Sequence, residues 1–282
     1  MTLAYSLAEV SPYINWLYFY HAWGMSGKPE AERLSLRHEA EERLDRYARR
    51  YQTHAVFQLF SAYSEGEEIV LSREMRSVGE VRIPLLRQQQ QGSEYLCLAD
   101  FVRPLQSPFV PQHPLAPVPP TSQIGLFATT VDACMETDFD DDPYEKMMMQ
   151  LLADRLAEAT AERLHDEVRK NYWGYARDEQ LTMADLLAGR WQGIRPAVGY
   201  PSLPDTSLNF VIDTLIDMKQ IGIRLTENGA MKPHASVSGM MFAHPEARYF
   251  SIGKIGEDQL RDYARRRGMS IKDIRKFLQA NL

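Results

Sequence analysis

The stretch DDDPYEKMMMQLLADRLAEATAERLHDEVRK, residues 140–170, predicts the longest helix of the chain. The acidic run Asp140–Asp142 and Pro143 suit a first helical turn. Carboxylates are stabilised at the positive end of the helix dipole, and proline lacks only an amide that would stay unpaired there. Met, Leu and Ala then recur at helical spacing until about Lys170. The segments that flank this helix decide the fold class.

Strand-like runs lie on both sides of the long helix. They are HAVFQLF (54–60), EIVL (68–71), YLCLADFV (95–102), IGLFATT (124–130), ASVSGMMFA (235–243) and RYFSIGKI (248–255). Turn residues such as Gly66 separate neighbouring runs, which favours antiparallel pairing. Further helices are expected at 29–50, at 208–221, at 257–267 and at 271–281, the last opened by Ser270 as its cap.

The order of these elements shows helices and antiparallel strands in blocks, without a β-α-β rhythm. It predicts an α+β fold in which helices flank an antiparallel sheet, as one domain over residues 1–282. The segment RPLQSPFVPQHPLAPVPP (103–120) has seven prolines among its eighteen residues. Such a segment can neither continue a helix nor pair as a central strand, so we expect a surface loop within the domain.

Composition excludes several classes of partner. The chain has 282 residues and a net charge of −6, so neither nucleic acid nor an anionic membrane surface would be attracted overall. The sequence has no apolar run of about 18 residues and no secretion signal at its start. Cys97 and Cys134 lie among apolar residues, which predicts two buried, reduced thiols and a cytoplasmic location.

The common catalytic and metal-binding motifs are missing from the sequence. The seven histidines show no His-x-x-x-His spacing, and the acidic run 138–142 lacks the glycine and distal glutamate of a calcium loop. Neither a dinucleotide-binding glycine motif nor a P-loop occurs, and no Gly-x-Ser-x-Gly is present. We therefore predict no metal site and no catalytic residue, and any adenosine-bearing ligand would bind outside those frames.

Three carboxylates line one face of the long helix. Asp154, Glu158 and Glu162 follow each other at intervals of four, with His165 one further turn along. Such charge runs are usually solvated stripes, partnered here by Arg155 and Arg163, and the residues alone favour that interpretation. The alternative is a carboxylate surface presented to a cationic or hydrogen-bonding partner.

The segment QGIRPAVGYP, residues 192–201, is the stronger candidate site; we call it the proline–glycine segment. Pro196 and Pro201 fix φ near −65°, and Gly199 permits conformations that are closed to other residues. The backbone between the prolines can therefore be held extended, with its amides and carbonyls turned outward.

Two side chains give this segment possible ligand contacts. Arg195 offers a fork of donors that matches a carboxylate, and Tyr200 offers a flat face with a polar tip. Together they could hold a small zwitterionic ligand. The residues alone fit a stiff connection between helices equally well, with the arginine bonded to a carbonyl.

Long ordered strings resemble the activation domain of cobalamin-dependent methionine synthase. The resemblance extends from about Tyr13 to the C-terminus. The strings that carry it are QGIRPAVGYPSLPDTS (192–207), YLCLADFV (95–102), MMMQLLADRLAEATAERLHDEVRKNYWGYA (147–176), LTENGAMKPHASVSGMMFAHPEARYF (225–250) and DQLRDYARRRGMS (258–270).

This resemblance implies a fold, a ligand and a role. The family fold is a single C-shaped α+β domain around a twisted antiparallel sheet. The implied ligand is S-adenosylmethionine, and the implied role is repair. Cobalamin that has reached the inactive cob(II)alamin state is reduced by one electron, usually from flavodoxin, and is then methylated by S-adenosylmethionine.

Ligand-contacting residues are implied by position. Arg195 would bind the ligand's carboxylate, while the backbone of Ala197 and Gly199 and the ring of Tyr200 would hold the adenosine side. A further ligand-contacting pair, which looks like Tyr-Tyr elsewhere in the family, matches Tyr249 and Phe250.

Asp154 and Glu158 match the helix face that meets the displaced cobalamin-ligand histidine of the neighbouring module. The resemblance therefore favours a docking role for these two carboxylates. It adds nothing for Glu162.

One position departs from the family pattern in a way that bears on affinity. Where the family usually shows Tyr-Ile-Asp-Trp, with the aspartate binding S-adenosylmethionine, this chain has Tyr13-Ile14-Asn15-Trp16. A neutral amide still accepts a hydrogen bond from the ligand's ammonium, but it loses the charge-assisted part, worth roughly 1–2 kcal/mol. We expect Asn15 to weaken binding by about tenfold or more.

The sequence lacks an Asp-x-His-x-x-Gly cobalamin motif and the cysteine triad of a homocysteine-activating zinc site. We therefore expect a stand-alone module that is not competent for methionine synthesis alone. It would dock on a separate corrinoid-binding protein such as a shortened methionine synthase, which holds the cobalamin, with a flavodoxin-like electron donor. Two alternatives are a module that only docks on a corrinoid protein without binding S-adenosylmethionine, and a reactivation module for another corrinoid methyltransferase.

Overall fold

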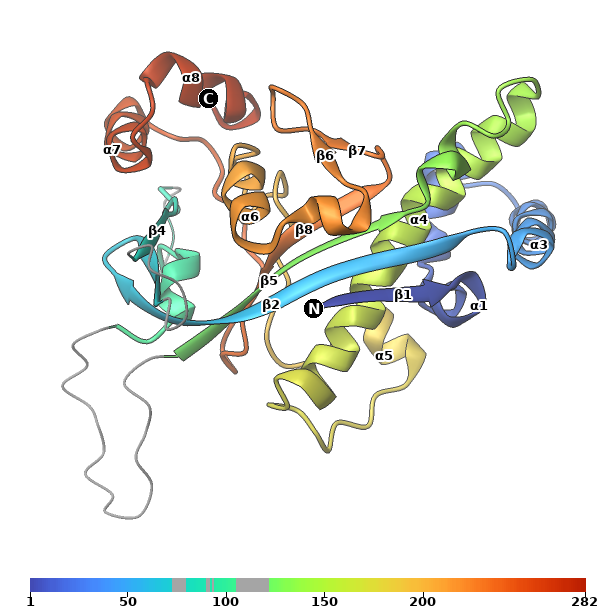
Figure 1. Cartoon of the computed structure of the whole chain (residues 1–282), viewed down its shortest axis with the longest axis horizontal. Helices are drawn as coiled ribbons and strands as arrows, with labels where there is room; N and C mark the ends of the chain where they lie inside the picture. The colour runs from blue at the N-terminus through green and yellow to red at the C-terminus, as the bar shows by residue number, and fades with distance from the viewer. Residues whose placement is uncertain (73–79, 90–91, 93, 105–121) are drawn as a thin grey trace. The chain divides into compact units, whose positions relative to one another are not determined.

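The computed structural model describes residues 1–72, 80–89, 92, 94–104 and 122–282 (Figure 1). Helices and antiparallel strands share the chain, which confirms the predicted α+β class. The larger sheet has the order β4-β3-β2-β5-β8, and β1 pairs with β2 outside that path. The proline-rich run predicted as a loop lies outside the described residues from position 105 onward.

Two compact units divide the chain, and β2, β5 and β8 each run through both of them. Unit 1 consists of Met1–Phe57, Phe127–Trp191 and Ile212–Ser238. Unit 2 consists of Gln58–Leu126, Gln192–Val211 and Gly239–Leu282. The candidate residues fall in both units, with Asn15, Asp154 and Glu158 in unit 1 and residues 195–200 and 249–250 in unit 2.

Unit 1 is built around the long helix α4 (Pro143–Glu167), drawn green to yellow in Figure 1. Asp142 caps it, because its side chain accepts hydrogen bonds from the amides of Tyr144 and Glu145, each at 3.1 Å. One face of α4 is buried through Met148, Leu152, Leu156 and Leu164, and each such side chain contributes roughly 1.5–3 kcal/mol on leaving water. The predicted start and apolar stripe are confirmed.

The rest of unit 1 surrounds α4 with short elements. Strand β1 (Thr2–Ser6) pairs antiparallel with the start of β2 (Gln52–Glu65), from Thr2↔Val56 to Ser6↔Gln52. The helices α1 (Leu7–Val10) and α2 (Trp16–Ala22) contact α4. The unit also holds α3 (Glu30–Tyr47), α5 (Met183–Leu187), and the hairpin of β6 (Arg224–Leu225) with β7 (Met231–Lys232).

Unit 2 contains a hairpin and a pair of helices. The end of β2 pairs with β3 (Glu68–Ser72), from Ser61↔Ser72 to Glu65↔Glu68, and β3 pairs with β4 (Val81–Pro84). Gly66 turns the chain between β2 and β3 with φ +58°. Leu260 and Tyr263 of α7 (Glu257–Arg267) pack against Ile274 of α8 (Ile271–Phe277) in one apolar cluster. The predicted cap of α8 is confirmed, because the Ser270 hydroxyl accepts from the Asp273 amide at 3.1 Å.

Three further predicted elements are present. The strands predicted at 124–130 and 235–243 are β5 (Ser122–Val131) and β8 (Ser236–Met241). The helix predicted at 208–221 forms α6 (Leu208–Ile216) and the 3-10 turn Met218–Ile221. The helix predicted at 208–221 is interrupted at Asp217, which has a left-handed φ of 51°. The Asp213 carboxylate accepts from the Met218 amide at 2.9 Å, so a local bond competes with the helical one. The α-helix therefore ends at Ile216, earlier than predicted, and Gly222 ends the 3-10 turn that follows.

Two predicted strands are absent from the described residues. Within 95–102 the chain forms a 3-10 turn, Leu98–Phe101. Two hydrogen bonds between Asp100 and the backbone of Cys97 stabilise this turn. The Asp100 carboxylate accepts from the Cys97 amide at 2.8 Å, and the Asp100 amide donates to the Cys97 carbonyl at 3.0 Å. Residues 248–255 carry no regular secondary structure.

The two cysteines are free thiols in different environments. Burial raises the pKa of the Cys97 thiol to about 12, so that thiol stays neutral. Cys134 is exposed, which contradicts the predicted burial. It belongs to the 3-10 turn Ala133–Glu136, where the apolar neighbour Met135 is buried in its place.

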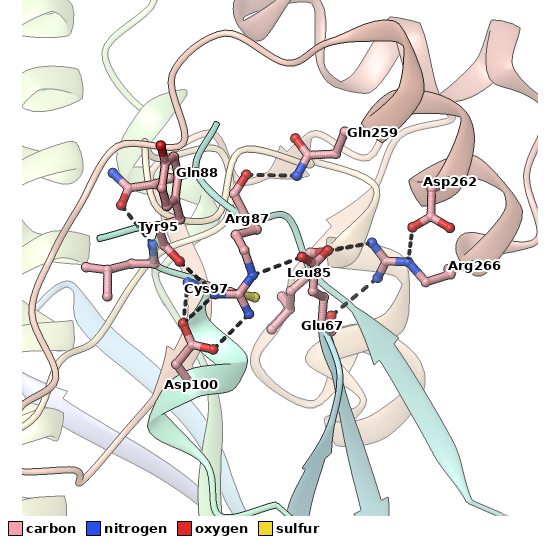
Figure 2. Close-up of polar contacts among 11 residues, drawn as sticks. Glu67, Leu85, Arg87, Gln88, Tyr95, Cys97, Asp100, Gln259, Asp262 and Arg266 are labelled. Carbon is pink, nitrogen blue, oxygen red and sulfur yellow. Dashed lines mark hydrogen bonds and ion pairs between the residues drawn. The ribbon is translucent and has the colours of Figure 1, made fainter. Parts of the chain in front are cut away.

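Unit 2 is held together beside the hairpin by a charged network (Figure 2). Glu67 lies between two arginines, accepting from Arg87 Nε at 2.9 Å and from an Arg266 terminal nitrogen at 3.3 Å. Arg87 also pairs with Asp100 at 2.8 Å, and Arg266 pairs with Asp262 at 2.7 Å. The network joins the turn after β2 to Arg87, to Asp100 and to α7.

Candidate ligand-binding site

The proline–glycine segment is anchored at its start by backbone bonds to the end of β8. The Ile194 amide and carbonyl exchange hydrogen bonds with Phe242, both at 2.9 Å, and the Pro196 carbonyl accepts from the Met240 amide at 3.1 Å. A single β-bridge joins Ala197 to Gly239. The segment is therefore positioned by a strand of unit 2 and is not a free connection between helices.

The end of the segment turns tightly at Gly199. Its φ is +88°, a conformation that side chains with a Cβ rarely adopt, so the predicted need for glycine is confirmed. The Gly199 amide donates to the Leu203 carbonyl at 2.8 Å, and the Tyr200 amide donates to the Ala197 carbonyl at 3.2 Å. These two amides serve the turn, which corrects the prediction that the amides of the segment face outward.

Two segments of unit 2 carry predicted ligand contacts, residues 195–200 and 249–250, and we call them the ligand segments. They lie in contact with each other in the structure. The Tyr249 hydroxyl accepts a hydrogen bond from the Arg195 amide at 3.0 Å. The side chains of Tyr200 and Tyr249 are both half-exposed, at 52%. Phe250 is partly buried, with its ring centroid 6.4 Å from that of Phe101. Six of the seven predicted ligand residues thus lie on two joined segments of one unit.

The seventh predicted ligand residue, Asn15, belongs to unit 1. It caps α2, and its side-chain oxygen accepts from the Leu17 amide at 3.1 Å. An asparagine side chain has one oxygen acceptor, whereas an aspartate has two. The oxygen of Asn15 is therefore engaged by its own helix.

The predicted docking carboxylates are both on α4 in unit 1. Burial raises the pKa of Asp154 above its usual value, while Arg155 and His234 act in the opposite direction. Asp154 Oδ1 lies 4.0 Å from His234 Nδ1. Glu158 follows one turn later and is half-buried. The stripe is therefore partly desolvated at these two positions.

His165 does not extend this carboxylate face, because its side chain is fully buried. Its ring packs edge-on against Trp191, with centroids 5.5 Å apart, and its Nε2 lies 3.3 Å from the Tyr175 hydroxyl. Arg163, one of the arginines expected to partner the stripe, forms ion pairs with Glu9 and Glu167. His165 is a core histidine.

Residues 6–268 match the family model for the activation domain of vitamin B12-dependent methionine synthase. The chain belongs to this family. A crystal structure described as the MetH reactivation domain bound to AdoHcy aligns with a TM-score of 0.87 and 35% sequence identity, over 100% of this chain and 90% of that one. The resemblance seen in the sequence is thereby confirmed for the family and its fold.

Among the described residues, no group of histidine, cysteine and acidic side chains could hold a metal ion. In the same part of the chain, no helix is both long and apolar enough to cross a membrane.

The activation domain also contains a residue that the sequence did not single out. Ser202 bonds to the backbone of Phe250, and a serine after a proline gives no sequence signal for such a contact.

Proposed function

We propose that this activation domain binds S-adenosylmethionine with residues 195–200 and 249–250 and presents its methyl group to a corrinoid protein. The carrying observation is the hydrogen bond that joins Arg195 to Tyr249, because it brings two ligand segments, far apart in sequence, to one place. The relative that is 35% identical over the whole chain is described as bound to AdoHcy. That ligand is S-adenosylmethionine without the transferred methyl group, so both share the same recognition groups.

The residues present fit the groups of this ligand. The Arg195 guanidinium matches the carboxylate of the methionine part, because arginine and carboxylate form charge-assisted, bidentate pairs. The half-exposed rings of Tyr200 and Tyr249 offer flat, amphipathic faces suited to the adenosine part. The remaining group of the ligand is its ammonium, for which the family position is Asn15.

When bound, S-adenosylmethionine supplies a sulfonium-activated methyl group to a cob(I)alamin nucleophile held by the partner. The sulfonium would leave as S-adenosylhomocysteine while the cobalamin nucleophile gained the methyl group, so no proton would move and no acid or base would be required of this chain. This chain's residues bind and orient the ligand, and positioning of this kind is itself a large contribution to rate. The electron that converts cob(II)alamin to cob(I)alamin would come from a flavodoxin-like protein.

We propose the Asp154 and Glu158 face of α4 as the contact for the corrinoid partner, which could be a shortened methionine synthase. Asp154 is partly desolvated, and that burial raises its pKa. A hydrogen-bond donor that approaches its carboxylate would offset the cost of desolvation and stabilise the charged form. A histidine side chain of the partner is such a donor.

Isothermal titration calorimetry of S-adenosylmethionine into the full chain tests the ligand site. We expect saturable binding by the wild type and binding at least tenfold weaker by Arg195→Ala, through loss of a charge-assisted pair. Arg261→Ala on α7, exposed in the same unit, is the matched control and should bind like the wild type. No binding at millimolar ligand by the wild type would overturn the proposal.

One observation favours a second function, that of a docking module without S-adenosylmethionine. Asn15 stands where the family has the aspartate that binds the ligand's ammonium, and its one oxygen is engaged as the cap of α2. Affinity of the chain for a corrinoid protein, measured with and without S-adenosylmethionine, separates the two functions. Equal affinity, together with no binding of the ligand alone, would support the docking module.

A further inference from the structure

Ser202 makes two hydrogen bonds to a single residue of the second ligand segment. Its side-chain hydroxyl accepts from the Phe250 amide at 3.0 Å and donates to the Phe250 carbonyl. Ser202 is buried, with 6% of its surface exposed. Both polar groups of the Phe250 backbone are thus satisfied by one side chain.

This arrangement replaces a normal strand pairing. In an antiparallel pair, one residue exchanges both its amide and its carbonyl with the residue opposite. Here the Pro201 carbonyl accepts from the Ile252 amide at 2.9 Å, but proline has no amide to donate. The proline–glycine segment cannot continue a backbone ladder, and the Ser202 hydroxyl supplies the donor and the acceptor that Phe250 needs.

The Ser202 contact lies at the opposite end of the junction from Arg195. The Arg195 amide bonds to the Tyr249 hydroxyl, and the Ser202 hydroxyl bonds to the Phe250 backbone. Tyr249 and Phe250 are therefore held at two points, Tyr249 by Arg195 of the proline–glycine segment and Phe250 by Ser202, which directly follows that segment. Phe250 is held a third time through its ring, which packs against Phe101.

We propose that Ser202 is a positioning residue that fixes Tyr249 and Phe250 against residues 195–200 and thereby sets the affinity for S-adenosylmethionine. This role rests on the proposed function. Without the Ser202 hydroxyl, the Phe250 amide and carbonyl have to find water, and the segment 249–250 can move away from residues 195–200. The binding of S-adenosylmethionine then has to bring residues 249–250 back against residues 195–200, and the free energy of this ordering lowers the affinity.

A merely structural serine would behave differently. Its loss would lower the melting temperature and leave the affinity of the folded protein unchanged. The control is Ser270→Ala, which removes the cap of α8 in the same unit and thus also costs stability without touching either ligand segment. Affinity and hydrogen exchange, both measured well below the melting temperature, distinguish the two roles.

The experiment compares the wild type, Ser202→Ala and Ser270→Ala by calorimetry with S-adenosylmethionine and by amide hydrogen exchange. For Ser202→Ala we expect faster exchange at the Phe250 amide and a dissociation constant raised by about tenfold. Ser270→Ala should keep the wild-type dissociation constant. Ser202→Cys keeps a side chain of similar size with weaker hydrogen bonding, and its affinity should lie between those of the wild type and the alanine variant.

The outcomes separate this inference from the proposed function. If the wild type binds and Ser202→Ala binds equally well, the positioning role is overturned and the ligand site stands. Unchanged exchange at the Phe250 amide in Ser202→Ala would also overturn the role. A wild type that binds no S-adenosylmethionine would overturn the proposed function and the affinity role with it. Should the alanine variant not fold, wild-type affinity of Ser202→Cys would contradict the inference.

Discussion

The side-chain oxygen of Asn15 accepts a hydrogen bond from the backbone amide of Leu17 at 3.1 Å. This contact caps α2 and uses the only oxygen that the side chain has. An aspartate at this position could cap the helix with one oxygen and keep the other, with its charge, for an ammonium group. The cap thus gives a physical reason for the expected effect of this departure from the family pattern.

Asn15→Asp should raise the affinity for S-adenosylmethionine by about tenfold, because one charge-assisted hydrogen bond replaces a neutral one. The stability of α2 should be kept, since asparagine and aspartate are similarly good caps. Calorimetry measures the first effect and thermal unfolding the second. Asn15→Ala should unfold more easily, by about 0.5–2 kcal/mol, through loss of the cap. An aspartate variant with unchanged affinity would show that position 15 does not meet the ligand.

Tyr249→Phe should weaken the junction between the two ligand segments. The variant keeps the ring but removes the hydroxyl that accepts from the Arg195 amide. Loss of this partner should cost about 0.5–1.5 kcal/mol of unfolding free energy and a severalfold loss of affinity for S-adenosylmethionine. Tyr95→Phe is the control, since Tyr95 is similarly exposed in the same unit. Chemical denaturation and calorimetry check the pair, and equal effects of both variants would contradict the assignment.

Gly199→Ala should destabilise the turn by conformation and not by collision. A Cβ at this position would meet Thr206 Cγ2 at 3.5 Å, an ordinary contact, but φ is +88°. We expect a loss of about 1 kcal/mol or more, measured by chemical denaturation. Gly199→Asn should lose less, because asparagine tolerates positive φ better than alanine. If the two variants were equally stable, steric contact would have to explain the effect.

Glu67→Gln should lower the unfolding free energy of the chain, because two arginines of unit 2 share the Glu67 carboxylate. Its oxygens accept from Arg87 at 2.9 Å and from Arg266 at 3.3 Å, and the Arg266 side chain is only 10% exposed. An amide turns one acceptor into a donor that faces a guanidinium group, which should cost about 1–3 kcal/mol in chemical denaturation. The matched control is Glu65→Gln. Glu65 pairs with Arg82 at the surface, so its loss should cost about 0–1 kcal/mol.

Long, periodic segments could be predicted from the sequence because their own residues determine them. The helix α4 carries its cap at Asp142 and its apolar stripe in order, so both follow from local residues and both predictions were correct. The runs 95–102 and 248–255 have strand-like composition, yet neither is a strand. In the first, a local Asp100 carboxylate outcompetes pairing. In the second, the partner segment contains Pro201, which cannot donate.

The candidate site could be predicted in its residue types and not in its contacts. Arg195, Gly199 and Tyr200 stand out as a pattern, and the family resemblance added Tyr249 and Phe250. That the Arg195 amide bonds to the Tyr249 hydroxyl follows only from tertiary structure, since 54 positions separate the two residues. The bond between the Phe250 amide and the Ser202 hydroxyl likewise depends on tertiary structure. The cap that Asn15 makes to Leu17 is local, and an asparagine before a helix is a pattern that indicates it.

Asp154 should make stability depend on pH in an unusual direction. Burial raises its pKa above the usual 3.8, more than Arg155 and His234 lower it. A carboxyl group whose pKa is higher in the folded state stabilises the fold fully below the usual value, and this contribution is lost as pH rises through the folded pKa. Asp154→Asn does not titrate. Its stability relative to the wild type should therefore increase as pH rises above about 4, until the pH has passed the raised pKa of Asp154 in the folded state.

Asp262→Asn is the control with the opposite sign. Its pairs with Arg265 and Arg266 lower the pKa of Asp262, so its contribution is present above the usual range and is lost as pH falls through the folded pKa. Asp262→Asn should be less stable than the wild type at neutral pH, and this difference in stability should disappear at low pH. Melting temperatures between about pH 3 and pH 8, the range of ordinary carboxyl titration, check both. Parallel curves for Asp154→Asn and the wild type would contradict the burial of Asp154.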